Sequence, residues 1–196
     1  MFEICCKKLS YISENYGIST YVLICDKELI DIAMKYPSVE IIIRDKETAE
    51  AEGPLRFIYK DILELPHKYL MFLNPCLIFL QPSTIVNQIM KFLISEKNYG
   101  TSVKKFQNWL WVKGDAKEIV IPLTDINYER LTTKEISNYY QAAHCFHIFN
   151  KELFKNDGYM LKNDLCLLEV PEEEVIDIDT REEYEYAKWK WEKVNI

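Results

Sequence analysis

The sequence contains few glycines, and none of them lie close together. Its five glycines, Gly17, Gly53, Gly100, Gly114 and Gly158, are spread over 196 residues. Phosphate-binding loops of the P-loop and dinucleotide types need closely spaced glycines, because the backbone must approach the phosphates. The sequence therefore predicts no glycine-rich phosphate cradle of the usual form. A Ser-His-Asp order typical of hydrolases is also absent.

Long apolar runs and blocks of positive charge are lacking as well. No apolar run approaches the length of about 18 residues that a membrane span needs, and the N-terminal residues MFEICCKKLS form no basic-then-apolar signal. The formal net charge is −7 and Lys and Arg form no block, which argues against a nucleic-acid binder. We therefore expect a cytoplasmic protein that binds neither a membrane nor a nucleic acid polymer.

The six cysteines show no Cys-x-x-Cys spacing, which excludes the common zinc and redox motifs. His144 and His147 lie three residues apart in an expected strand, so they should point to opposite faces and share no metal. Disulfides are rare in a reducing cytoplasm. Most of the cysteines lie within apolar runs, and we expect free, buried thiols at Cys5, Cys6, Cys25, Cys76, Cys145 and Cys166.

What the sequence does contain is an alternation of apolar runs with helical stripes. Hydrophobic residues make up 48% of the chain, enough for one domain spanning residues 1–196. Nearly continuous apolar runs, typical of buried parallel strands, occur at Thr20–Cys25, Val39–Ile43 and Tyr69–Leu73. Helical spacing occurs at Met1–Tyr16, after Asp26, after Gly53-Pro54 and from Pro82. The alternation predicts an α/β three-layer sandwich with a mostly parallel sheet.

After Tyr99 the pattern changes to strands and a hairpin. The expected strands here are Gly100–Phe106, Trp109–Val112, Glu118–Ile121, Tyr139–Phe149 and Leu165–Val170. Gly114-Asp115 is a turn signal, and we expect a hairpin arm at about residues 106–138. Trp109 and Trp111 on this arm fit the interface of a homodimer, although packing on the parent sheet fits them equally well.

Two acidic residues near the C-terminus form the most informative motif. Val175-Ile176 has the character of a short strand, and Asp177-Ile178-Asp179 follows directly. Alternate strand residues point to the same face, so Asp177 and Asp179 should project together, roughly 6–7 Å apart. Two such carboxylates suit Mg²⁺, which prefers oxygen ligands and often bridges to phosphates.

A helix should follow these acids at once. Thr180 and Glu183 have the spacing of a capping box, and the expected apolar stripe of the helix is Tyr184, Ala187, Trp191 and Val194. Asp and Thr are also ordinary cap and loop residues, and Asp-x-Asp often arises by chance. The pattern alone therefore leaves both a metal site and a simple helix cap open.

The run EEEVIDIDTREEYEYAK resembles the C-terminal signature of the acylneuraminate cytidylyltransferase family, the CMP-sugar synthetases for sialic, legionaminic and pseudaminic acids. The resemblance implies a nucleotide-diphosphosugar transferase-like (Rossmann-like) fold. It also implies that Asp177 and Asp179 are catalytic and hold Mg²⁺. The implied reaction is transfer of CMP from CTP to a nonulosonic acid, with release of pyrophosphate.

Other segments resemble the same family. Tyr69–Ile85 is similar to a strand and loop that contact the sugar, with Asn74 in place of a Gln. Gln141 lies in a run similar to a strand beside the sugar site. Both side chains are amides that can donate and accept hydrogen bonds. Cys76, Leu77 and Ile78 replace polar residues of that loop, so a hydrophobic loop that seals the sheet is the alternative.

Two further positions match residues that lie near the nucleotide in the family. These are Asp26, the remaining acid of a Ser-Thr-Asp-Asp run, and Arg44, which follows the strand Val39–Ile43. Without the resemblance, a surface ion pair is the simpler role for Arg44.

The family begins with a strand and a Gly/Arg/Lys loop that wraps the triphosphate, and by resemblance this chain starts at the helix after them. Lys104, Lys105 or a second subunit are the candidates that could replace the missing positive charge. Three alternatives stay open: an active transferase, a catalytically inactive homologue that binds a sugar or nucleotide or serves in an assembly, and one part of a longer enzyme.

Overall fold

The computed structural model of the protein describes residues 1–113, 120–123, 132–133 and 138–194. The first half of the chain contains α1 (Phe2–Tyr16), β1 (Tyr21–Ile24), α2 (Lys27–Ala33), β2 (Glu40–Ile43), α3 (Lys46–Ala49), α4 (Leu55–Ile58), the 3₁₀ helix η1 (Lys60–Glu64), β3 (Tyr69–Leu73) and α5 (Pro82–Ile94). The second half contains β4 (Tyr99–Phe106), β5 (Trp111–Lys113), β6 (Val120–Pro122), β7 (Tyr139–Asn150), α6 (Lys151–Asp157), β8 (Leu165–Glu169), the 3₁₀ helix η2 (Glu172–Glu174) and α7 (Arg181–Val194).

The first elements form where their end signals predict. Helix α1 ends at Gly17, which adopts the left-handed conformation with φ 64° that glycine tolerates best. Helix α2 begins after Asp26, whose Oδ1 accepts a hydrogen bond of 2.8 Å from the Glu28 amide. The predicted strands at Thr20–Cys25, Val39–Ile43 and Tyr69–Leu73 are confirmed as β1, β2 and β3.

The expectation of a mostly parallel sheet is wrong, because the main sheet is mixed. Its strand order is β3-β7-β4-β8, and β7 runs antiparallel to both β3 and β4, whereas β8 runs parallel to β4. Strands β1 and β2 form a separate parallel pair. The described part of the chain between β4 and β7 contains the short strands β5 and β6 and no crossover helix, and such a return permits antiparallel pairing.

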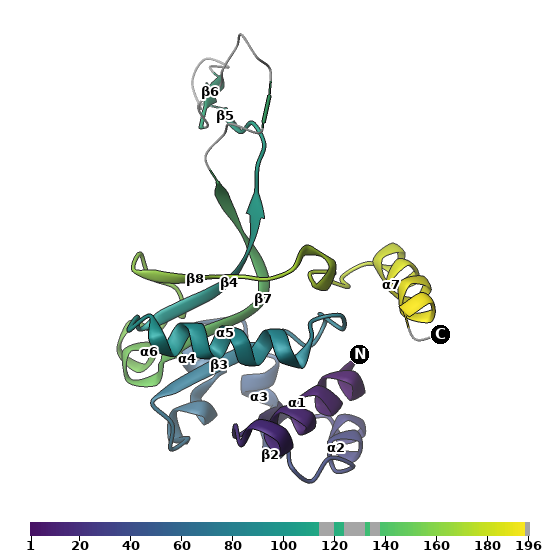
Figure 1. Ribbon diagram of the computed structural model, residues 1–196. Helices are drawn as coiled ribbons and strands as arrows, with labels where there is room; N and C mark the ends of the chain where they lie inside the picture. Colours follow the sequence, from purple (N-terminus) through teal and green to yellow (C-terminus); the bar gives the residue numbers. More distant parts are fainter. Residues whose placement is uncertain (114–119, 124–131, 134–137, 195–196) are drawn as a thin grey trace.

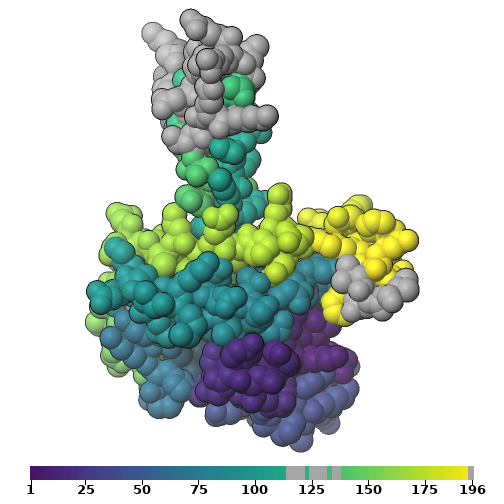
Figure 2. Space-filling view, viewed as in Figure 1, coloured from purple at the N-terminus to yellow at the C-terminus, as the bar shows by residue number. Residues whose placement is uncertain are grey.

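Strands β4 and β7 continue beyond the main sheet as a two-stranded arm, which carries β5 and β6 (Figure 1). In β5 and β6, Val112 pairs with Ile121. The rings of Trp109 and Trp111 meet edge to face with centroids 6.4 Å apart. Trp111 is exposed. Figure 2 shows that the arm projects from the body of the molecule and that α7 lies at one side of the body. The turn signal at Gly114-Asp115 lies outside the described residues.

The main core lies against the four-stranded sheet. The largest fully buried side chains include Phe92, Phe146, Phe149 and Phe154. Gly100 on β4 lets α5 approach the sheet closely, because a Cβ built there would lie 2.8 Å from the Phe92 ring. All six cysteines are free, as predicted, but only Cys5, Cys6 and Cys145 are buried and Cys25 is exposed.

Three local expectations differ from the structure. Val175-Ile176 belongs to no strand; the segment between η2 and α7 has no regular secondary structure and no strand partner among the described residues. The helix expected after Pro54 is split into α4 and η1. Met34, one of the apolar residues in the helical pattern expected after Asp26, lies at the end of α2 and is 68% exposed. No described helix has both the length and the apolar character needed to cross a membrane.

Candidate functional site

Asp177 and Asp179, here called the acid pair, flank a buried anchor. Ile178 lies in a small core cluster with Ile78, Phe79 and Ala187 of α7, while Asp177 is half-buried and Asp179 is exposed. The anchor fixes this unpaired segment through side-chain packing instead of through sheet hydrogen bonds. The sequence predicted that the acid pair lies on a strand. In the structure, the packing of Ile178 positions the acid pair instead.

The predicted capping box at the start of α7 is confirmed. Thr180 Oγ1 accepts a hydrogen bond from the Glu183 amide at 3.2 Å, and Glu183 Oε2 accepts one from the Thr180 amide at 2.8 Å. Glu183 Oε2 also accepts from the Asp179 amide at 2.9 Å. The cap therefore uses the backbone of Asp179 and the side chains of Thr180 and Glu183, and leaves the Asp179 carboxylate exposed.

The acid pair lies near the carboxyl end of β3. Burial raises the pKa of the Cys76 thiol, and the negative charges of Asp177 and Asp179 raise it further. Burial, with a smaller contribution from Asp177 and Glu174, raises the pKa of the Cys145 thiol to about 12. Both carboxylates therefore act on one thiol, which indicates that the two are neighbours in space.

Asn74 lies in the same place. Its amide donates a hydrogen bond of 2.9 Å to the Cys145 carbonyl, and its side-chain Oδ1 accepts one of 2.9 Å from the Cys76 amide. This turn uses the carboxamide oxygen, so Nδ2 is the group left to contact a ligand. The structure thus brings both Asn74 and the acid pair close to Cys76.

His144, next to Cys145 on β7, has a backbone conformation that the sequence did not predict. It has a φ of 52°, unusual for a residue with a side chain. It lies beside Cys145 at a bulge in the pairing of β4 with β7. The hydroxyl of Ser102 stabilises this bulge by accepting hydrogen bonds from the amides of Cys145 (2.9 Å) and Phe146 (3.1 Å). No signal in the sequence predicts a positive φ at a histidine.

Gln141 lies further along β7, at the base of the arm. It is exposed and pairs with Lys104 of β4, and the next pair is Lys105 with Tyr140. The structure therefore brings Gln141 together with the two lysines that were candidates for replacing positive charge. Among the described residues, no hydrogen bond or ion pair joins this group to the acid pair.

Asp26 and Arg44 lie at the carboxyl ends of β1 and β2, where the Arg44 amide donates a hydrogen bond of 2.8 Å to the Ile24 carbonyl. The guanidinium of Arg44 is not a surface group. Its Nη2 donates to the carbonyls of Thr48 (2.8 Å) and Ile58, and its centre lies 5.6 Å from the Tyr59 ring centroid.

The Arg44 side chain is only 10% exposed, and its Nε is 4.0 Å from Asp61 Oδ2. Both of these atoms are buried without a hydrogen-bond partner among the described residues. Arg44 therefore joins α3 to α4 with part of its hydrogen-bonding capacity unused.

The loop after Asn74 is apolar and buried. Leu77, Ile78, Phe79 and Leu80 are each less than 10% exposed, so this part of the loop seals the core, as the alternative reading of the sequence predicted. Lys8 of α1 donates hydrogen bonds to the carbonyls of Leu77 (3.1 Å) and Ile78 (2.6 Å). Burial lowers the pKa of Lys8 to about 8.

Comparison with known proteins identifies the fold. No protein-family model and no curated protein matches the sequence. The structure of 4-diphosphocytidyl-2C-methyl-D-erythritol synthase from Anaerococcus prevotii DSM 20548 is similar, with a TM-score of 0.67 and 13% identity over 97% of this chain and 85% of that chain. CMP:2-keto-3-deoxy-manno-octonic acid synthetase complexed with CTP matches with a TM-score of 0.62 and 9% identity, over 96% of this chain and 87% of that one.

A further 4-diphosphocytidyl-2C-methyl-D-erythritol synthase has a TM-score of 0.55 and 10% identity, over 93% of this chain and 89% of that chain. At these identities the likeness shows the fold alone. The chain has an α/β fold of the nucleotide-diphosphosugar transferase type, as the sequence resemblance implied, and it shares this fold with cytidylyltransferases.

Proposed function

We propose that this chain is a cytidylyltransferase that transfers CMP from CTP to a sialic-acid-type nonulosonic acid. The observation that carries the proposal is the packing of Ile178, between Asp177 and Asp179, against Ile78 and Phe79 of the loop that follows Asn74, in a fold shared with cytidylyltransferases. The similar structures include an enzyme complexed with CTP, which supports CTP as the nucleotide. The resemblance of the C-terminal run supports a nonulosonic acid as the acceptor.

The acid pair would hold Mg²⁺ in this enzyme. Among the described residues there is no group of three or more His, Cys, Asp or Glu able to hold a metal. Two carboxylates fit Mg²⁺, which is often held by one or two carboxylates and completes its shell with water and substrate phosphates. The bound ion would neutralise charge on the reacting phosphate. Asp177, the half-buried member, is the more fixed ligand of the two.

The other expected site residues have distinct roles in this proposal. Asn74 Nδ2 would contact the sugar acid beside the acid pair, and Gln141 would contact it from β7. Asp26 and Arg44 would approach the nucleotide at the ends of β1 and β2. Arg44 has to exchange at least one of its present contacts to do so, because its Nη2 already donates to two carbonyls.

Pyrophosphate release tests the proposal. The purified chain is incubated with CTP, Mg²⁺ and a panel of nonulosonic acids, and we expect release with at least one acid. Asp179→Ala should lower the rate by on the order of a hundredfold, because the Mg²⁺ ion that stabilises the transition state loses one of its carboxylate ligands. Asp164→Ala, which removes an exposed acid paired with Lys97, is the matched control and should keep the rate.

A catalytically inactive homologue is the second candidate. It is favoured by the contacts that hold Arg44 in place and by the burial of the loop side chains at Leu77–Leu80. This candidate predicts saturable binding of a sugar acid or of CTP, measured by calorimetry, without pyrophosphate release. Release that Asp179→Ala abolishes would contradict it.

We further propose that residues 1–196 form one domain and that its arm mediates a homodimer. Trp111 is exposed on β5 of the arm, and aromatic residues are enriched in interfaces. Light scattering should give the mass of a dimer for the wild type and of a monomer for Trp111→Ser. A wild-type monomer at micromolar concentration would contradict the proposal.

A further inference from the structure

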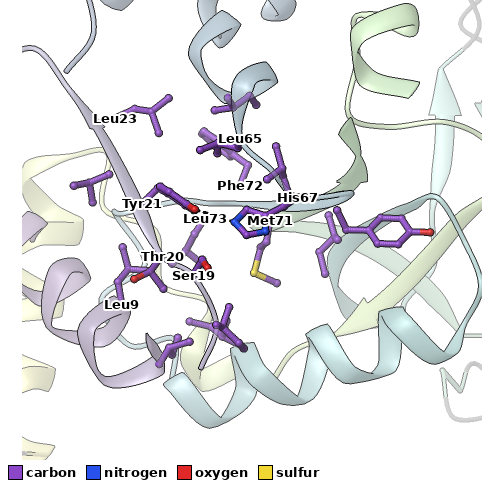
Figure 3. Close-up of a pocket in the computed structure, with 18 of the residues that line it drawn as sticks. Leu9, Ser19, Thr20, Tyr21, Leu23, Leu65, His67, Met71, Phe72 and Leu73 are labelled. Carbon is purple, nitrogen blue, oxygen red and sulfur yellow. Dashed lines mark hydrogen bonds between the residues drawn. The ribbon is translucent and has the colours of Figure 1, made fainter. Parts of the chain in front are cut away.

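The middle layer of the molecule is interrupted between β1 and β3. Here lies a cavity of about 490 Å³, which we call the β1–β3 slot. Its sides are formed by residues 20–23 and by the whole of β3. Tyr21 and His67 point toward one another across it (Figure 3), and the Tyr21 hydroxyl lies 2.8 Å from His67 Nε2. Because this contact runs through two long side chains, it holds the two strand backbones apart.

The hydrogen bonds of β1 show that its other edge faces the slot. The Glu40 amide donates to the Thr20 carbonyl, and the Arg44 amide donates to the Ile24 carbonyl. In a strand the backbone groups of alternate residues point to opposite edges. Thr20, Val22 and Ile24 therefore face β2, and the N–H and C=O groups of Tyr21 and Leu23 face away from it.

Strand β3 also has one edge that faces the slot and pairs with no described strand. The Lys151 amide donates to the Lys68 carbonyl, and the Asn74 amide donates to the Cys145 carbonyl. The even-numbered residues of β3 therefore face β7. The odd-numbered residues present their N–H and C=O groups to the slot, without a sheet partner among the described residues; they are Tyr69, Met71 and Leu73.

The slot is apolar above and below the plane of the strands. Helices α1 and α5 line one face with Cys5, Leu9, Ile12, Ile85 and Ile89, and α4 with η1 lines the other with Tyr59, Ile62 and Leu65. A strand covered by helices on both faces is a continuous apolar run. The walls therefore select an occupant that is apolar on both faces and that carries hydrogen-bonding groups along both edges.

We propose that the β1–β3 slot binds an extended apolar segment of another polypeptide, which adds as a strand between β1 and β3. The joined sheet would then run β2-β1-segment-β3-β7-β4-β8. A small apolar molecule would fill the volume but leave the edge groups of Tyr21, Leu23 and Met71 without partners, at a cost for each group. A folded second copy of this chain could not reach a space that helices cover on both faces.

The length of the occupant follows from the strands beside it. Strand β3 contains five residues and β1 contains four. The segment therefore needs about five apolar residues in an uninterrupted run without proline, because proline would remove a donor.

Amide hydrogen exchange of the full chain tests the proposal. The probe is a synthetic peptide with five alternating Val and Ile residues between pairs of Lys, and the control peptide has Pro at the central position. With the probe, exchange at Tyr21, Leu23, Tyr69, Met71 and Leu73 should slow by about tenfold or more, since each gains a hydrogen-bonded partner. The amides of Val22 and Leu70, which already face β2 and β7, should not change, and the proline peptide should have little effect.

A pair of variants tests the edge itself. Met71→Pro removes an N–H that faces the slot but leaves the pairing of β3 with β7, so it should weaken peptide binding by about tenfold. Met71→Ala, the matched control, should bind within about twofold of the wild type. If Met71→Pro does not fold, the exchange experiment on the wild type decides alone.

Several results would overturn the proposal. The first is binding of the Val/Ile peptide without slowed amide exchange at the odd-numbered residues of β3. The second is binding of the proline peptide as tightly as the Val/Ile peptide. The third is slowed exchange at these residues when the chain dimerises without any peptide. If the dye 1-anilinonaphthalene-8-sulfonate binds in the slot as well as the peptide does and amide exchange does not change, the slot is a pocket for small molecules instead.

Discussion

The two parts of the interrupted middle layer differ in how they are held. In the four-stranded sheet, β7 and β4 are paired on both sides, and the large side chains beneath them are fully buried. The β1–β2 pair is connected to that sheet through helices and through side chains such as Tyr21 and His67. The comparison indicates that the four-stranded sheet is held by strand pairing, with β3 as its open edge at the slot, whereas the β1–β2 pair at the predicted nucleotide end is held by side-chain contacts.

The largest expected effect is a difference in the free energy of unfolding between core variants of the four-stranded sheet and of the β1–β2 pair. Phe146→Ala on β7 should lower the free energy of unfolding by about 3–5 kcal/mol, because it leaves a cavity in a closed core. Leu23→Ala on β1 should cost less than about 2 kcal/mol, because this side chain already borders open space. Urea denaturation of both variants makes the measurement. Equal losses would show that the β1–β2 half is packed as tightly as the main sheet.

A second pair of variants tests how closely α5 packs on the four-stranded sheet. Gly100→Ala places a methyl group 2.8 Å from Phe92 Cδ2 and 3.1 Å from Leu168 Cδ1, and should cost about 1–3 kcal/mol through overpacking. Gly53→Ala, where no atom lies within 4 Å, should change stability by less than about 0.5 kcal/mol. A tolerated Gly100→Ala would mean that α5 can move away from the sheet.

The segment that carries the acid pair is held by a helix cap, and not by strand pairing. Thr180→Ala removes the side-chain acceptor of the Glu183 amide and should cost about 1 kcal/mol. Denaturation followed by circular dichroism measures this loss, with Thr133→Ala, outside α7, as the control. No loss would show that the packing of Ile178 and Ala187 is sufficient.

The same cap predicts a dependence on pH. Hydrogen bonds from the amides of Asp179 and Thr180 lower the pKa of the Glu183 carboxyl below its usual 4.5. A carboxyl with a lowered pKa in the folded state contributes stability that is fully present above pH 4.5 and is lost as the pH falls through the lowered value. Amide exchange in the first turn of α7 should therefore increase in acid, and Glu183→Gln should remove this increase.

The fold was predictable from sequence to the extent that it depends on local signals. Gly17, Asp26 and the Thr180–Glu183 spacing each marked a helix end, and the apolar runs marked β1, β2 and β3. The strand order was not predictable, because the antiparallel entry of β7 depends on the arm and not on any local pattern. Val175-Ile176 reads as a strand because it is apolar, but its partners are side chains of α7 and of the loop after β3.

The candidate site was predicted only in part for the same reason. Sequence identified the acid pair and Asn74, which the structure brings together. The surface ion pair that was the alternative role for Arg44 does not fit, because the Arg44 side chain is only 10% exposed. Cys76 became visible as a neighbour of the acid pair only in three dimensions. The roles of Gln141, Asp26 and Arg44 toward ligands stay predictions.

The most direct test of the acid pair as a cation site uses the thiol of Cys76, on which the charges of both members act. Bound Mg²⁺ would offset the negative charges of Asp177 and Asp179 that raise the pKa of Cys76, so the thiol should ionise at lower pH. Below that pKa, alkylation of Cys76 by iodoacetamide should become at least about threefold faster with Mg²⁺ than with Na⁺ at equal ionic strength. The double variant Asp177→Asn and Asp179→Asn should react faster without Mg²⁺ and show no response to it. A wild-type rate that millimolar Mg²⁺ leaves unchanged would contradict a cation site at Asp177 and Asp179.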